Sequence, residues 1–149
     1  MRIRLKISRF LGLLWLALPL TALADIAVVV HPANPVRALT PRQVSDLYLG
    51  RVRNFSLGNE PSLVAVTIYE QPTDSELRES FFRVLNGMPV KQLNAYWARL
   101  RFSGEVLPPV TLASSRDVIG RVGKDLSAIG YVDAAVLDGS VKVVLLLKH

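Results

Sequence analysis

The side chains able to do chemistry in this sequence are mainly hydroxyl and guanidinium groups, because the chain has two histidines and no cysteine. Neither a Cys–His pair nor a metal site built from cysteine and histidine is therefore expected. The sequence contains no GxSxG motif and no glycine-rich phosphate loop. Ser75, Ser114 and Ser115 stand where helix caps commonly stand, so we interpret them as caps rather than nucleophiles. We expect a protein that is not an enzyme and uses no metal or cofactor; a small hydrolase is the weakest alternative.

The segment YEQPTDSELRESFFRVL, residues 69–85, is typical of a strand end, a polar turn and a helix start. The first N–H groups of a helix have no partner within the helix and carry partial positive charge, so a helix start can hold an anion. Thr73, Ser75 and Arg78 are the candidate ligand-binding residues here, two hydroxyl groups and one cation. The alternative is a helix start that is closed by its own side chains.

Self-capping is the interpretation that the residue spacing favours. Thr73 and Glu76 have the spacing of a capping box, in which the glutamate turns back onto the unpaired N–H groups. Asp74 and Glu79 add negative charge to the same helix end, which stabilises the helix and disfavours a bound dianion. Arg78, the one cation nearby, lies one turn after Asp74 and can pair with it locally.

Two further segments are candidate anion sites. Arg51, together with Arg53, follows the first predicted helix, where the alternative is an arginine that is simply exposed to solvent. Ser114, Ser115 and Arg116 open another predicted helix and are candidate ligand-binding residues, with simple capping as the alternative.

Aromatic and apolar residues offer candidate partner surfaces. Tyr96, Trp97 and Phe102 lie on one predicted helix, and we expect core positions for them, with a partner groove as the alternative. The run VKVVLLLK, residues 141–148, predicts a buried strand. If that strand were an exposed edge, it would invite pairing with another chain.

The first 24 residues have the pattern of a secretory leader. Four basic residues precede the apolar run LGLLWLALPL, and Ala22 and Ala24 give the small-x-small pattern that signal peptidase accepts. We therefore predict cleavage after Ala24 and a periplasmic location, with an uncleaved anchor as the alternative. No cysteine follows the apolar run, so a lipid-anchored form is not expected.

Removal of the leader changes the charge balance. Four of the 18 Lys and Arg residues lie in it, so the remaining 125 residues would carry 14 basic and 12 acidic side chains, a net charge of +2. This small excess argues against nucleic acid as a partner. Residues 25–149 suit one domain, which must be stabilised by apolar burial because disulfides are impossible.

Strands and helices alternate along the remaining chain. Thr40 and Pro41 mark one helix start, and Gly50 marks its end. Predicted strands cover residues 25–30, 63–70, 110–113, 128–132 and 141–147, and predicted helices cover residues 41–49, 74–85, 90–102 and 114–124. This alternation predicts a three-layer α/β domain with a mostly parallel sheet of about four or five strands.

Four pieces in order resemble a known family. YLGRVRNF, VAVTIYEQPTDSELRESFFRVL, AYWARLRFSG and AIGYV are similar to segments of the phosphate-binding subunit of bacterial phosphate importers. They resemble small exported proteins of the same superfamily more closely. The likeness covers most of residues 40–132, and it implies a type II periplasmic-binding-protein fold and a periplasmic solute-binding role.

The sequence departs from this family where phosphate would bind. Ser75 matches the serine of the family's SGT turn, but Glu76 and Leu77 replace its glycine and threonine. Gln71 falls where the family usually has a phosphate-binding arginine. The resemblance, taken with these departures, implies weakened or altered anion binding.

Length gives a further expectation, because 125 residues match little more than one lobe of a two-lobed binding protein. One lobe presents half a cleft, in which phosphate stays hydrated, so high affinity would need a second chain. The resemblance implies phosphate or another small oxyanion as ligand and a membrane permease as partner, and a homo-oligomer is possible on the same grounds. The alternative is a periplasmic adaptor or sensor module that binds an envelope or membrane protein.

Overall fold

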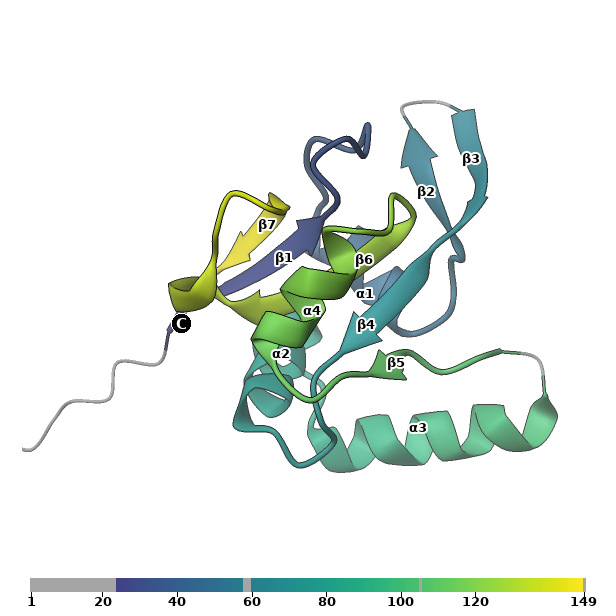
Figure 1. Cartoon of the computed structure of the whole chain (residues 1–149). Helices are drawn as coiled ribbons and strands as arrows, with labels where there is room; N and C mark the ends of the chain where they lie inside the picture. Colours follow the sequence, from purple (N-terminus) through teal and green to yellow (C-terminus); the bar gives the residue numbers. More distant parts are fainter. Residues whose placement is uncertain (1–23, 58–59, 105, 149) are drawn as a thin grey trace, which may run out of the picture.

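The computed structural model describes residues 24–57, 60–104 and 106–148 (Figure 1). The predicted leader falls outside the described residues except for Ala24. The strands are β1 (Ile26–Val30), β2 (Asn54–Leu57), β3 (Glu60–Ala65), β4 (Thr67–Glu70), β5 (Val110–Thr111), β6 (Ala128–Asp133) and β7 (Lys142–Leu147). The helices are α1 (Pro41–Tyr48), α2 (Glu76–Asn86), α3 (Val90–Ser103), α4 (Ser115–Val122) and the short 3-10 helix η1 (Ala134–Val136).

The main sheet has five strands in the order β5-β4-β6-β1-β7. β4 pairs in parallel with both β5 and β6, whereas β1 is antiparallel to its neighbours β6 and β7. Four of the five strands therefore point the same way, which confirms the predicted α/β fold with a mostly parallel sheet. All five residues of β1 are buried, as expected of a β-branched strand inside a covered sheet.

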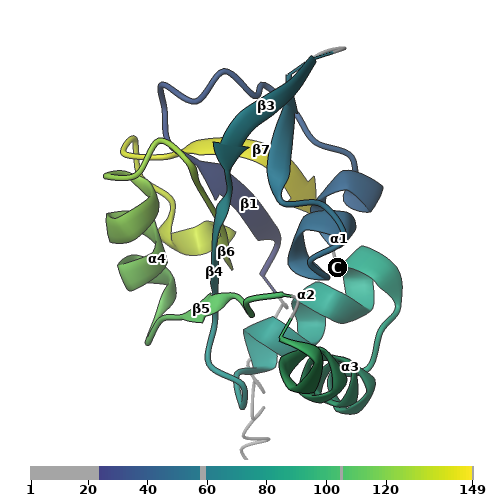
Figure 2. The ribbon, with the colours of Figure 1, turned by 90° about the vertical axis from the view of Figure 1, so that its right-hand side faces the viewer.

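Helices cover both faces of this sheet. Figure 2 shows α4 on one side of the strands and α1 and α2 on the other. The larger core, on the side of α1 and α2, includes Tyr48, Phe81 and Tyr131. The smaller core, under α4, includes Val118 and Val122. One core on each face of the sheet confirms the predicted three-layer arrangement.

The cap signals of α1 are confirmed by the structure. The Thr40 side chain accepts a hydrogen bond from the backbone N–H of Gln43, and the Gln43 Oε1 accepts one from the backbone N–H of Thr40 at 2.8 Å. Pro41 is the first helical residue, and Gly50 after the helix has a φ of 68°, which favours glycine.

A β-hairpin was not predicted from the sequence. Residues 54–57 were expected to be loop, and residues 63–70 were expected to form one strand. In the structure β2 pairs with β3 in a separate two-stranded sheet. β4 begins only after Val66, because residues 60–65 pair with β2 whereas Thr67 and Ile68 pair with β6.

Two predictions of burial were wrong in part. β7 is an edge strand, and the exposed fractions of Val143 and Leu146 are 39% and 43%. Phe102 is exposed and Tyr96 is half-buried, whereas Trp97 is buried in the core as expected. No helix in the described part of the chain is long and apolar enough to cross a membrane.

Candidate functional site

The carboxyl ends of three parallel strands meet at one edge of the sheet. α2 follows β4 at this edge, and α4 follows β5. Binding sites in α/β sheets commonly lie at such an edge, because loops and helix starts converge there. The edge is therefore the place to test the residues that the sequence singled out.

Ser75 is the N-cap of α2, as its position in the sequence predicted. Its Oγ accepts a hydrogen bond of 3.4 Å from the backbone N–H of Arg78. The predicted capping box of Thr73 and Glu76 is wrong, because Glu76 is already the first residue of the helix and Thr73 lies in the turn before the cap. The helix start is nonetheless closed by a side chain of the protein itself.

Replacing the two hydroxyl residues separately tests this assignment. We expect Ser75→Ala to lower the free energy of unfolding by about 1 kcal/mol, the usual effect of losing an N-cap. Thr73→Ala is the matched control, and its effect should stay within about 0.5 kcal/mol because Thr73 is exposed. Urea unfolding followed by circular dichroism measures both values. A larger loss of unfolding free energy for Thr73→Ala than for Ser75→Ala would contradict the Ser75 cap and support the predicted capping box.

Arg78 forms a buried ion pair with Glu70 at the end of β4. The Arg78 Nε donates to Glu70 Oε2 at 3.1 Å, and the side chains are 3% and 7% exposed. The guanidinium also donates to Asn94 Oδ1 at 3.1 Å and lies 5.7 Å from the centre of the Phe82 ring. The predicted pairing of Arg78 with Asp74 is therefore wrong. Both ionic partners are withdrawn from water, so the pair is a fixed part of the site.

The environment of Glu70 opposes its ionisation. Burial raises the pKa of this carboxyl above its ordinary value, and the charge and hydrogen bond of Arg78 lower it again by less than that rise. A carboxyl withdrawn from water is more easily protonated, because water no longer stabilises the charge. The ionised form of Glu70 thus depends on Arg78.

Gln71 is held in a second buried network beside this pair. Its Nε2 donates to the Tyr131 carbonyl at 3.0 Å and to Ser115 Oγ at 3.2 Å, and its backbone N–H donates to the Tyr131 hydroxyl at 3.3 Å. Ser115 Oγ also accepts from the backbone N–H of Asp133 at 3.2 Å. Gln71 is 3% exposed. The network joins β4, β6 and α4, and it uses both amide protons of the glutamine.

A polar hollow of about 310 Å3 opens beside the Glu70–Arg78 pair. Thr73 and Arg78, two of the predicted ligand-binding residues, line this polar hollow together. Asn94 and Arg101 of α3 line it as well. The sequence-predicted residues Thr73 and Arg78 are thus brought together, although a carboxylate is part of the same wall.

The other predicted site residues lie elsewhere or have local partners. Arg51 is exposed and pairs with Asp46 at 3.3 Å. Ser114 is the N-cap of α4 and accepts from the backbone N–H of Asp117. Ser115 follows it and is not the cap; its side chain belongs to the Gln71 network. Arg116 is exposed.

Sequence reasoning missed Glu70, Asn94 and Tyr131 as parts of this edge. One sequence feature could have pointed to Glu70, because it is the single charged residue of a mostly apolar predicted strand and stands at its end. Asn94 lies on α3, sixteen residues after Arg78, and local spacing contains no sign of their contact. Tyr131 was assigned to a strand without a role.

Comparison with known proteins finds similar folds among solved structures only. No protein-family model matches the sequence, and a search of curated proteins found no match. Solved structures that are similar over most of the chain include the following three. A Clostridium perfringens protein described as a phosphate ABC transporter substrate-binding protein, solved with bound phosphate, is 22% identical over 83% of this chain and 46% of its own, with a TM-score of 0.63. An ABC-type phosphate transport receptor from Vibrio cholerae is also 22% identical, over 83% of this chain and 47% of its own, with a TM-score of 0.62. PstS from Borrelia burgdorferi is 13% identical over 86% of this chain and 49% of its own, with a TM-score of 0.60.

The chain therefore has the fold that these phosphate-transport proteins share, as the sequence resemblance implied. It spans just under half of their length. The related structures are described as binding proteins or transport receptors rather than enzymes.

Proposed function

We propose that this chain is a periplasmic solute-binding-like protein without enzymatic activity whose anion site is weakened by its own side chains. It would be exported by the leader, cleaved after Ala24, and act as one domain over residues 25–149. A small oxyanion such as phosphate would be its ligand, and an importer permease or envelope protein its partner. The fold shared with phosphate-transport proteins supports the class.

The buried Glu70–Arg78 pair is the main observation that supports weakened anion binding. A dianion needs cations and N–H donors that are free to turn toward it. At this edge Arg78 donates to Glu70 and Asn94, while the amide protons of Gln71 are used within the chain. Glu70 also places a negative charge in the wall of the polar hollow. Phosphate would have to compete with an internal carboxylate for Arg78.

The share of the related structures that the chain covers gives a second reason. Substrate-binding proteins commonly enclose a ligand between two bodies, where water is excluded and charge interactions are strong. The chain matches just under half of each related structure. Tight enclosure of an anion would therefore draw on a second body, such as another copy of the chain or a partner protein.

A phosphate titration of the wild-type protein tests this proposal. Thermal unfolding should show a midpoint that rises only at millimolar phosphate, because a ligand that binds only the native state stabilises it measurably once its concentration exceeds its dissociation constant. Saturation at micromolar phosphate would show a transport receptor with an intact site. No shift at any phosphate concentration would instead favour the adaptor or sensor module.

Glu70→Gln is the informative variant for the same titration. It removes the carboxylate while keeping a similar shape, so the buried Arg78 charge lacks its counter-ion and lines the polar hollow. We expect phosphate to bind this variant at least tenfold more tightly, about the effect of one hydrogen bond to a charged group. Glu79→Gln is the control, because Glu79 is exposed and its oxygen lies 4.0 Å from Arg83. Equal affinities for the two variants would contradict competition by Glu70.

A further inference from the structure

One face of α3 lines the polar hollow at the carboxyl edge. Four residues of this helix contribute to the wall, namely Asn94, Trp97, Ala98 and Arg101. Their spacing of three and four residues places them on one side of the helix. The anion sites predicted from the sequence lie at helix starts or in the loop after α1, so this face of α3 is a separate candidate.

Arg101 is the lining cation whose charge no ion pair balances. Arg78, the other cation of the polar hollow, is paired with Glu70. Arg101 is exposed and has no ion pair with any of the described residues. Burial raises the pKa of Glu70, and the charge of Arg101, after that of Arg78, opposes this rise, so its charge acts on the same wall. Two arginines against one glutamate leave one positive charge in excess among the described residues that line the hollow.

Asn94 and Trp97 bring hydrogen-bond donors to the same face of α3. The guanidinium of Arg78 donates to Asn94 Oδ1 at 3.1 Å, and a guanidinium can only donate. This bond fixes the amide, so Nδ2 is the group left to donate elsewhere, and it has no acceptor among the described residues. Trp97 is 4% exposed, and its buried Nε1 has no hydrogen-bond partner in the described part of the chain. A buried donor without an acceptor is unfavourable, and an oxygen of a bound molecule can remove that cost.

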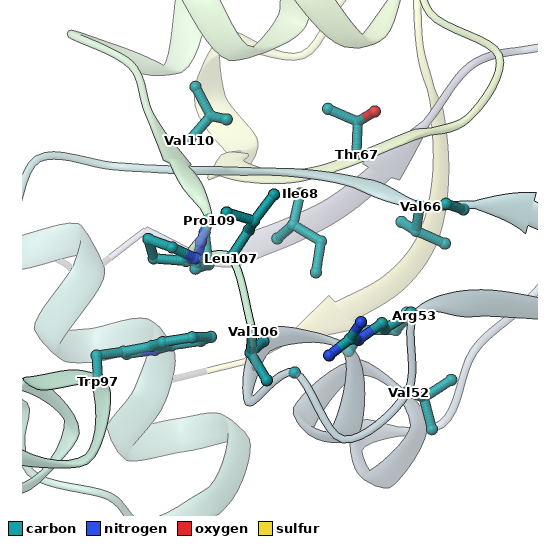
Figure 3. Close-up of a pocket in the computed structure, with 14 residues that line it drawn as sticks. Val52, Arg53, Val66, Thr67, Ile68, Trp97, Val106, Leu107, Pro109 and Val110 are labelled. Carbon is teal, nitrogen blue, oxygen red and sulfur yellow. The ribbon is translucent and has the colours of Figure 1, made fainter. Parts of the chain in front are cut away.

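A neighbouring apolar hollow shows how the Trp97 ring is turned. This apolar hollow has a volume of about 390 Å3, and Trp97 lines both hollows. The Cη2 end of the ring lies beside Gly50, which lines the apolar hollow. Figure 3 shows a carbon end of the ring pointing toward Val106, with the ring nitrogen farther from it. The indole donor is therefore on the side of Asn94 and Arg101, which line the polar hollow alone.

We propose that this face of α3 binds a singly charged oxyanion, such as a sulfonate or carboxylate head group, in the polar hollow. The Arg101 guanidinium would supply the counter-charge, and Asn94 Nδ2 and Trp97 Nε1 would donate to the oxygens. A single charge matches the one positive charge in excess, whereas the cost of withdrawing an ion from water grows with the square of its charge. The inference rests on the proposed function, since it names the cation and the ligand class of the same hollow.

Methanesulfonate, sulfate and dimethyl sulfone are the matched probes, because they share a tetrahedral sulfur and carry one, two and no negative charges near neutral pH. Titration calorimetry of the wild-type protein at constant ionic strength should show one methanesulfonate per chain. It should bind at least about tenfold more tightly than dimethyl sulfone, and more tightly than sulfate. Equal binding of dimethyl sulfone would contradict a charged site. Tighter binding of sulfate would contradict a site for a single charge.

Arg101→Gln and its control Arg99→Gln assign the binding to the polar hollow. Both arginines are exposed residues of α3, but of the two only Arg101 lines the hollow. Arg101→Gln should weaken methanesulfonate about tenfold and leave dimethyl sulfone unchanged, because only the charge is lost. Arg99→Gln should leave the binding of both probes unchanged. Circular dichroism shows whether each variant is folded.

The Trp97 indole N–H signal in NMR spectra gives an independent readout of the same site. It should move as methanesulfonate is added and follow the calorimetric binding curve, because the buried donor gains an acceptor. A signal that stays in place while methanesulfonate binds would contradict the proposed contact.

The outcomes separate this inference from the proposed function. If Arg101→Gln binds methanesulfonate as tightly as Arg99→Gln does, the site on α3 is overturned, while a millimolar response to phosphate would still support the proposed function. Binding of phosphate without binding of methanesulfonate would likewise overturn the inference alone. Binding of neither anion by the wild-type protein would overturn both.

Discussion

Replacing Arg78 by methionine should lower the free energy of unfolding by about 3–5 kcal/mol at neutral pH, the usual cost of removing one partner of a buried ion pair. The Glu70 side chain, which is only 7% exposed, would remain buried without its cation. The variant would also lose the hydrogen bond to Asn94 and the contact with the Phe82 ring. Urea unfolding followed by circular dichroism measures the change.

The destabilisation of Arg78→Met should depend on pH. Burial already raises the pKa of Glu70 from its ordinary value of 4.5, and Arg78 opposes that rise. Without Arg78 the pKa of the folded state moves further above that of the unfolded chain. The folded state then keeps a proton that the unfolded chain releases, so stability is greatest below about pH 4.5 and falls as pH rises through the folded-state pKa. The variant should be destabilised less at pH 5 than at pH 8.

The double variant Glu70→Gln with Arg78→Met is the control for this explanation. It removes both charges, so the stability lost by Arg78→Met should be partly recovered, and the difference between pH 5 and pH 8 should shrink. A double variant as unstable as Arg78→Met at pH 8 would mean that packing of the Arg78 stem, rather than charge, stabilises this part of the fold.

Phe81→Ala should cost about 3–5 kcal/mol of unfolding free energy, because a large buried ring leaves a cavity that the core fills only in part. Phe81 is fully buried, and its ring stacks on Tyr131 at a centroid distance of 3.7 Å with an interplanar angle of 6°. Tyr48 and Phe82 meet the same ring edge-on, each at 5.0 Å. Since Tyr131 accepts a hydrogen bond from Gln71, losing this stack should also loosen the carboxyl edge.

Phe102→Ala is the matched control for Phe81→Ala, because Phe102 is 94% exposed. Its effect on unfolding should stay within about 0.5 kcal/mol. Amide hydrogen exchange at Gln71 should quicken in Phe81→Ala and stay unchanged in Phe102→Ala. A loss of less than about 1 kcal/mol for Phe81→Ala would be smaller than burial of its ring alone predicts, and would contradict the role given to the stacked rings in this core.

The sequence alone predicted the elements that depend on neighbouring residues. The Thr40 cap, the Pro41 start and the Ser114 cap were recognised, because the side chain and the backbone groups that it bonds are at most three residues apart. The buried β1 and β6 were recognised from unbroken apolar runs. The order of strands and helices then indicated a covered sheet, and four short motifs indicated the fold seen in the phosphate-transport structures.

The tertiary structure decided everything that depends on residues far apart in the chain. Residues 63–69 are mostly apolar without a break, so their pattern does not show that β2 would pair with the first half and β6 with the second. Arg78 had Asp74 as its nearest candidate partner, yet it pairs with Glu70 across the turn and with Asn94 on another helix. Gln71 bonds groups 44 and 60 residues away. Local spacing determines caps and helix faces, whereas the partner of a buried charge is set by which elements the sheet brings together, because a buried charge is stabilised only by a group that folding places within hydrogen-bond distance.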